Sequence, residues 1–201
     1  MGYLEEFGNV VYKTRSARFT AYHRMKRNRD ASKVAEAMCS ASIIAISLIA
    51  LQCKTIDMAY MMSMLTIIMS TFLLVLSLLF SSLDYDGRKE NYHACGNELN
   101  RLYRKIHHDA KVLSDEEQHE KELEYLKYYE DILDKYNLNH ATFDYQYAVA
   151  MMKDADTSAM TRLWLQIRYY IIDVYIIYWL IAILPILAIA IYFVEHLYLK
   201  Q

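Results

Sequence analysis

Few polar residues in this 201-residue chain have the types and spacing that chemistry requires. His140 and Asp144 are four residues apart, so on a helix they would share one face, as a general base and its orienting carboxylate do. No nucleophile accompanies them, and such a pair is more often a structural hydrogen bond. The adjacent His107 and His108 would point in different directions, which disfavours metal binding. Without a Gly-rich phosphate loop, GxSxG or HExxH, we expect no enzyme activity, cofactor or metal site.

A second set of polar residues has helical spacing within an uncharged stretch. Steps of three, four and seven residues place its members on one helix face: Ser63, Thr66, Ser70 and Ser77. Small residues allow helices to approach closely in lipid, and their hydroxyls bond across helices. The alternative is that these hydroxyls line a water-filled pore in an oligomer. Both interpretations stay open.

Two acids and the only proline lie in or near apolar stretches. An acid inside a membrane is a functional candidate by default. Glu36 and Asp173, however, lie within about one helical turn of a predicted span's end, so we expect them to anchor the interface. Pro185 falls in the middle of an apolar stretch, where it removes a backbone donor and makes either a hinge or a static bend.

Three nearly uncharged segments contain the hydroxyl set, the two acids and the proline: residues 34–51, 58–83 and 171–194. About 20 apolar residues are needed to cross a bilayer as a helix, so each segment is a candidate span. Only residues 52–57 separate the first two, which predicts a tight antiparallel hairpin. The chain has only four glycines and one proline, and this scarcity of helix-breaking residues also favours long helices. We predict an all-α membrane protein with an N-terminal transmembrane hairpin, a cytoplasmic antiparallel helical domain and a third, C-terminal transmembrane helix.

The positions of Lys and Arg predict the orientation of the spans. Lys54 and Lys200 are the only basic residues expected on one side. The opposite side carries those nearest the other span ends, namely Arg24, Lys26, Arg27, Arg29, Lys33, Arg88, Lys89, Arg101, Arg162 and Arg168. Cytoplasmic loops are the ones enriched in Lys and Arg. We therefore expect the N-terminus and the middle domain in the cytoplasm and the C-terminus outside.

Charge also divides the chain outside the spans. Residues 1–33, a basic juxtamembrane arm, have eight Lys and Arg against three acids, whereas residues 84–156 have ten against seventeen. Opposite charges on one side of the membrane favour contact between the arm and this middle domain. Because the arm adjoins a span, anionic lipid explains its charge more simply than nucleic acid, and we expect no direct nucleic-acid binding.

Periodicity predicts two antiparallel helices in the middle domain. Apolar residues recur at helical spacing in two runs, Leu99, Leu102, Ile106 and Leu113, then Leu126, Tyr129, Leu133 and Tyr136. Between the runs, Ser114 and Glu117 have the spacing of a capping box. Residues 157–201 are predicted as an interfacial helix that continues into the third span, with its N-cap at Asp156 or Thr157.

Two stretches resemble a known family. Residues 84–106, DYDGRKENYHACGNELNRLYRKI, resemble the segment after the hairpin in the SLATT family, the SMODS and SLOG-associating two-transmembrane effectors, most of all its fifth subfamily. Residues 129–145, YEDILDKYNLNHATFDY, resemble the family's second cytoplasmic segment, with Asn139, His140, Asp144 and Tyr145 as motif residues. The basic lead at residues 13–18 also fits, so the resemblance covers about residues 10–150.

The resemblance implies a membrane effector of a prokaryotic conflict system, located in the bacterial inner membrane. Members are encoded beside sensors such as cyclic nucleotide synthases or reverse transcriptases, and are thought to assemble and permeabilise the membrane. The third span exceeds the family's two-span name. Our leading hypothesis is therefore a homo-oligomeric pore former that a separately encoded sensor triggers. The alternatives are a non-conducting scaffold whose cytoplasmic helices dock a partner, and a membrane hydrolase built on His140 and Asp144.

Overall fold

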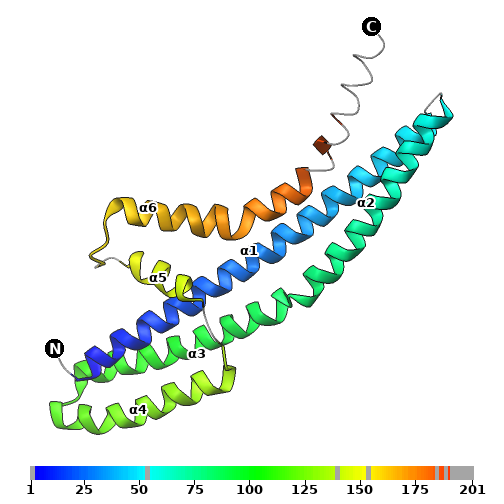
Figure 1. Cartoon of the computed structure of the whole chain (residues 1–201). Coiled ribbons are helices and arrows are strands. Elements are labelled where there is room, and N and C mark those ends of the chain that lie inside the picture. Colours follow the sequence, from blue (N-terminus) through cyan, green and yellow to red (C-terminus); the bar gives the residue numbers. More distant parts are fainter. Residues whose placement is uncertain are drawn as a thin grey trace. The chain divides into compact units, whose positions relative to one another are not determined.

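The computed structural model describes residues 3–52, 55–138, 141–152, 155–183, 186, 187 and 190, and within these ranges the secondary structure is entirely helical (Figure 1). The elements are α1 (Tyr3–Gln52), α2 (Ile56–Ser82), α3 (Tyr85–Val112), α4 (Asp115–Tyr136), α5 (Thr142–Ala150), α6 (Ala159–Ile167) and the π-helix η1 (Arg168–Tyr175). Three stretches, in α1, in α2–α3 and from α6 to Ile183, are long and apolar enough to cross a membrane. The all-helical class is thus confirmed, and each predicted span overlaps one of these stretches. In the third predicted span, the part beyond Ile183 lies outside the described residues except at positions 186, 187 and 190.

The chain divides into two compact units that are discontinuous in sequence. Residues 1–26 and 86–169 form one, here called the polar unit, and residues 27–85 and 170–201 form the other, here called the membrane unit. Residues 1–26 of the basic arm therefore share a unit with most of the acidic middle segment, whereas residues 27–33 belong to the membrane unit. All three candidate spans contribute to the membrane unit.

Helix α1 runs without interruption through the predicted arm and the first span. Its 50 residues include no proline and only one glycine, so nothing in the sequence breaks the helix. In its apolar half, the buried residues Ala35, Cys39, Ser42 and Ile46 recur at steps of four, three and four, the spacing of a helix-packing seam. Within the membrane unit, α2 lies beside the apolar half of α1 and runs in the opposite direction (Figure 1).

The core of the polar unit joins three helices. Leu4, Phe7 and Val11 of α1 pack with residues of α3 and α4, among them Leu99, Leu102, Ile106, Tyr125 and Ile132. Helices α1 and α3 approach closely at Gly96 of α3, where an added Cβ atom would lie 3.1 Å from the ring of Phe19 in α1. The arm is held by this apolar core as well as by its charge.

The connection between α3 and α4 has the predicted capping box, in which the Glu117 carboxylate accepts hydrogen bonds from the Ser114 N–H at 3.0 Å and its hydroxyl at 2.9 Å. The buried Gln118 amide donates to the carbonyls of Ala110 and Leu113 at the end of α3. These carbonyls lack partners within their own helix, so Gln118 satisfies groups that the turn would otherwise leave buried.

The helix that follows residue 158 differs from the prediction at its start and in its centre. Ser158 is the N-cap, not Asp156 or Thr157, because its hydroxyl accepts the Thr161 N–H at 3.1 Å. The helix continues past Ile167, as expected, but through the π-helical turns of η1. Such turns are uncommon and are frequent at functional sites.

Candidate functional site

The first candidate site is the serine face of α2, defined as Ser63, Thr66, Ser70 and Ser77. The three serines are exposed and Thr66 is half-buried. Three of the four hydroxyls donate to the carbonyl four residues earlier: Ser63 at 2.8 Å, Thr66 at 2.9 Å and Ser70 at 2.7 Å. With their donors satisfied inside the helix, these side chains need no partner helix to lie in an apolar environment, and their oxygens can still accept hydrogen bonds.

The residues of α2 that are buried within the chain form a different stripe. Met62, Met69 and Leu76 lie at steps of seven. Each precedes one of the serines, so the serine face lies about 100° around the helix from this seam. Packing within the chain therefore uses the apolar seam and leaves the serine face exposed.

Most of the remaining surface of α2 is apolar. Large exposed side chains include Ile67, Ile68, Phe72, Val75 and Leu78. A contiguous apolar surface of this kind marks contact with lipid or with another protein. Within it, the serine face is a polar stripe, and Thr71 is a further exposed polar residue outside this stripe.

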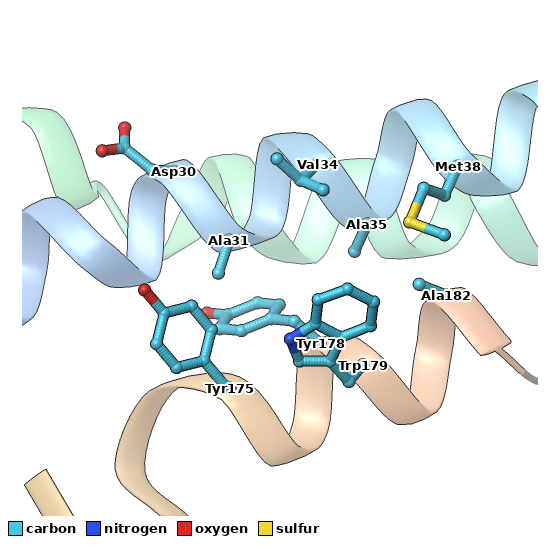
Figure 2. Close-up of a pocket in the computed structure, with 9 residues that line it drawn as sticks. All are labelled: Asp30, Ala31, Val34, Ala35, Met38, Tyr175, Tyr178, Trp179 and Ala182. Carbon is cyan, nitrogen blue, oxygen red and sulfur yellow. The ribbon is translucent and has the colours of Figure 1, made fainter. Parts of the chain in front are cut away.

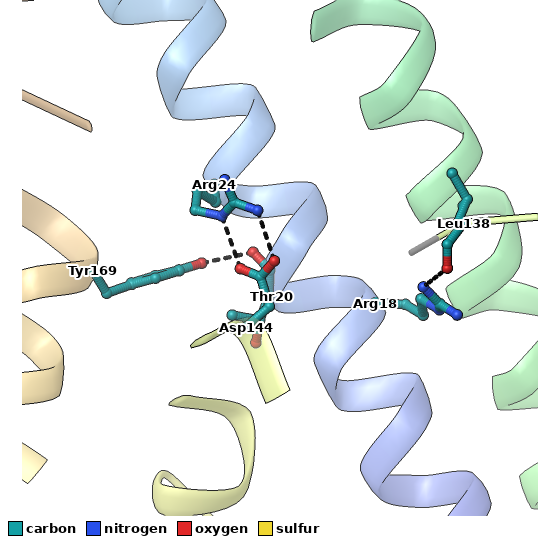
Figure 3. Close-up of polar contacts among 6 residues, drawn as sticks. All are labelled: Arg18, Thr20, Arg24, Leu138, Asp144 and Tyr169. Atoms are coloured by element: carbon teal, nitrogen blue, oxygen red, sulfur yellow. Dashed lines mark hydrogen bonds and ion pairs between the residues drawn. The ribbon is translucent and has the colours of Figure 1, made fainter. Parts of the chain in front are cut away.

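The second candidate site is a buried ion pair in the polar unit (Figure 3). Arg24 of α1 donates from Nε to Asp144 Oδ1 at 2.8 Å and from Nη2 to Oδ2 at 2.7 Å. The side chain of Asp144, in α5, has no exposed surface, and that of Arg24 is 16% exposed. Bidentate, charge-assisted hydrogen bonds are among the strongest in proteins, so this pair fixes α5 on α1.

Two further contacts fasten chain segments to the same stretch of α1 (Figure 3). The Tyr169 hydroxyl, at the start of η1, donates to the Thr20 carbonyl at 2.9 Å in a buried setting. Tyr147 of α5 stacks on the Tyr169 ring with centroids 4.0 Å apart. The buried Arg18 donates to the Leu138 carbonyl, just beyond α4. Within the polar unit, α1 thus holds α5 and the start of η1 by polar contacts.

Side-chain contacts between α3 and α4 shift several pKa values. The hydrogen bond from Lys135 holds the pKa of the Glu98 carboxyl below its usual value, with a second bond from Tyr136. Hydrogen bonds from His108 and from the Tyr125 hydroxyl lower the pKa of Asp109 in the same way. Burial, and then the hydrogen bond to Asp109, raises the pKa of Tyr125. The α3–α4 pair of helices is therefore more stable when the carboxyl groups of Glu98 and Asp109 are ionised.

The structure places the predicted site residues in separate settings. Asp144 is buried and both its oxygens bind Arg24, whereas its neighbour Tyr145 is 38% exposed. Asp173 is half-buried in η1. The predictions for Asn139, His140 and Pro185 lie outside the described residues. Among the described residues, no group of three His, Cys, Asp or Glu is arranged to hold a metal ion.

The residues that sequence reasoning missed are Arg24, Thr20 and Tyr169. The opposite charges of arm and middle domain predicted that they would meet, but not which residues would pair. Arg24 and Asp144 are 120 positions apart, and Tyr169 bonds to a backbone carbonyl, which has no signature in the sequence. Arg24 is one of several basic residues in the arm, and nothing in the sequence distinguishes it.

Comparison with known families gives one match. The family model described as SMODS and SLOG-associating 2TM effector domain family 5 matches residues 2–191, nearly the whole chain. No curated protein and no solved structure shows significant similarity to the chain. The match includes the third candidate span and the segments that carry both candidate sites.

Proposed function

Because the chain belongs to the SMODS and SLOG-associating 2TM effector domain family 5, we propose that it is a membrane effector of a prokaryotic anti-phage system which self-associates and opens a conduit across the inner membrane. The family description associates such domains with SMODS and SLOG proteins. The observation that carries the proposal is the largely exposed serine face on a mostly apolar candidate span.

The serine face is suited to contact between copies of the chain. Small side chains let helix backbones approach closely in lipid, where packing and not hydrophobicity drives association. The intrachain seam of Met62, Met69 and Leu76 leaves the face available. When several copies meet around an axis, hydroxyl oxygens such as those of Ser63 and Ser70 are available to solvate water or ions passing between them.

We further propose that a separately encoded sensor, such as a cyclic nucleotide synthase or a reverse transcriptase, acts on the polar unit from the cytoplasm. Helix α1 and η1 each begin in this unit and continue into a candidate span. The Arg24–Asp144 pair and the Tyr169–Thr20 bond hold the two chain segments together at that point. A partner that favours the broken arrangement of these contacts would shift the equilibrium between two states of the spans.

The test is growth of bacteria that express the full chain, alone and with its neighbouring sensor. We expect growth arrest with loss of membrane potential, and we expect Ser70→Leu to relieve it. Thr71→Leu is the matched control, because Thr71 is also exposed, also bonds to the carbonyl four residues earlier at 3.0 Å, and lies about 100° away around the helix. Immunoblots of the membrane fraction establish equal abundance.

Two outcomes would contradict the conduit. Arrest that survives the change of all four serine-face residues to Ala or Leu would show that the face plays no part in it. Equal relief by Ser70→Leu and Thr71→Leu would show a general effect on the helix. A chain that assembles but never arrests growth would favour the non-conducting scaffold.

A further inference from the structure

A cavity of about 220 Å³ lies within the membrane unit, between α1 and the helix that continues from η1 (Figure 2). Val34, Ala35 and Met38 form its wall on α1, and the rings of Tyr178 and Trp179 face them from the other helix (Figure 2). Apart from the tyrosine hydroxyls, the Trp179 indole N–H and the Asp30 carboxylate at one end, the lining is apolar. Such a cavity favours an apolar ligand.

Two properties of the cavity identify the kind of ligand. Val34 is 54% exposed and Trp179 is 49% exposed, so the cavity opens at the surface of helices that are candidate spans. Its surroundings in a membrane are therefore lipid. Pockets for drug-sized ligands occupy about 300–1,000 Å³. A smaller space, lined by residues 30–38 of α1 and 175–182 of the other helix, suits part of a linear hydrocarbon chain better than a nucleotide.

Cationic residues cluster in the sequence of α1 around Asp30, which lines one end of the cavity. Residues 27–33 of α1 contain Arg27, Arg29 and Lys33 against a single acid, Asp30. The Arg27 guanidinium lies 4.6 Å from the centre of the Tyr170 ring, and Arg29 binds Asp30 at 2.8 Å. Lys33 is exposed and directly precedes Val34. Cations at the edge of an apolar span attract the phosphates of lipid headgroups.

We propose that this cavity is a phospholipid site, which takes one acyl chain between Val34 and Trp179 and places the phosphate at Arg29 and Lys33. The site needs only that the helices lie in a membrane. The proposal does not depend on conduction or on contact between copies, so a negative result for the conduit would not contradict the phospholipid site.

Tryptophan fluorescence gives a direct test, because the chain has only two tryptophans, Trp164 and Trp179. Trp164→Phe leaves Trp179 as the only tryptophan. The full-length variant, purified in detergent, is titrated with a phospholipid brominated on its acyl chains, since bromine quenches a nearby indole. We expect quenching that saturates at a defined ratio of lipid to protein. Quenching that rises without saturation, as in simple mixing with the micelle, would overturn the site.

Val34→Phe and Val75→Phe form a matched pair on this background. Both valines are exposed residues of the membrane unit, but only Val34 lines the cavity. A phenyl ring at position 34 that displaces about two methylenes of the acyl chain should weaken binding roughly tenfold. Val75→Phe should leave the midpoint unchanged. Equal midpoints for the two variants would refute the location.

The headgroup is tested by a variant that leaves the cavity intact. Lys33 is exposed, so Lys33→Gln should preserve the fold while weakening phospholipid binding several-fold. A brominated fatty alcohol, which has the chain but no phosphate, should bind more weakly than the phospholipid and should not respond to Lys33→Gln. Equal binding of the two probes would overturn the assignment to a phospholipid.

Discussion

Replacing Asp144 with asparagine should loosen α5 from α1 without unfolding the rest of the chain. The Asp144 side chain has no exposed surface, and it neutralises an Arg24 guanidinium that is itself only 16% exposed. Removing one partner of a buried ion pair typically costs about 3–5 kcal/mol, because the other charge stays buried without compensation. Arg24 retains some exposure and asparagine still offers one acceptor, so we expect about 3 kcal/mol, the lower end of that range.

Hydrogen–deuterium exchange of the full chain in detergent measures this change where it occurs. Amides that exchange through local opening report the free energy of that opening. About 3 kcal/mol corresponds to roughly 100-fold faster exchange in peptides from α5, residues 142–150. Glu124→Gln is the control, because it removes a carboxylate from an exposed pair with Lys121 and should leave exchange nearly unchanged.

A double variant separates the ion pair from general disruption. Arg24→Met with Asp144→Leu replaces both charges by apolar groups, which in buried pairs is often close to neutral. Exchange in α5 should therefore return most of the way toward that of the parent. Exchange in Asp144→Asn that stays within threefold of the parent would refute the view that the pair holds α5 in place. Equal effects of Asp144→Asn and the double variant would show that packing, not charge, dominates.

Three further results are expected. Tyr169→Phe should cost about 0.5–1.5 kcal/mol and speed exchange near residue 20, because it removes the hydrogen bond from the Tyr169 hydroxyl to the Thr20 carbonyl, which keeps its bond within α1. Ser114→Ala should lower the stability of the α3–α4 hairpin by about 1 kcal/mol in thermal unfolding followed by circular dichroism, because the N-cap is lost. The carboxyl pKa values of Glu98 and Asp109 are lowered in the folded chain, so their ionised forms stabilise it. This stabilisation is complete above the ordinary pKa values of 4.5 and 3.8 and is lost as pH falls through the lower folded values, so the chain should unfold more easily at pH 3 than at pH 6. Asp109→Asn combined with Glu98→Gln should reduce that difference.

The elements that depend on local sequence were predictable. Uncharged stretches identified the candidate spans, because a charge in lipid is costly whatever the fold. Ser114 and Glu117 identified the start of α4, because a capping box needs only residues three positions apart. The continuity of α1 was not predicted, since its charge changes sharply near Lys33 although nothing there breaks a helix.

The polar contacts and the cavity depend on the tertiary fold. Asp144 was singled out by its spacing from His140, but its described partner is Arg24, 120 positions away. Tyr169 lies in the segment predicted as an interfacial helix, but its burial and its bond to the Thr20 carbonyl follow only from the fold. The cavity beside Trp179 arises from the way two helices pack, and no periodic pattern in the sequence predicts it.

The most direct test of the central claim is cysteine crosslinking across the serine face in native membranes. Cys39, Cys53 and Cys95 are first replaced by alanine, and a single cysteine is then introduced by Ser70→Cys or by Ile68→Cys. Both positions are exposed, but two residues place Ile68 about 200° away around α2, on the opposite face. Self-association through the serine face predicts oxidised dimers with Ser70→Cys and few with Ile68→Cys. Dimers with Ile68→Cys alone, or equal yields from both, would contradict it.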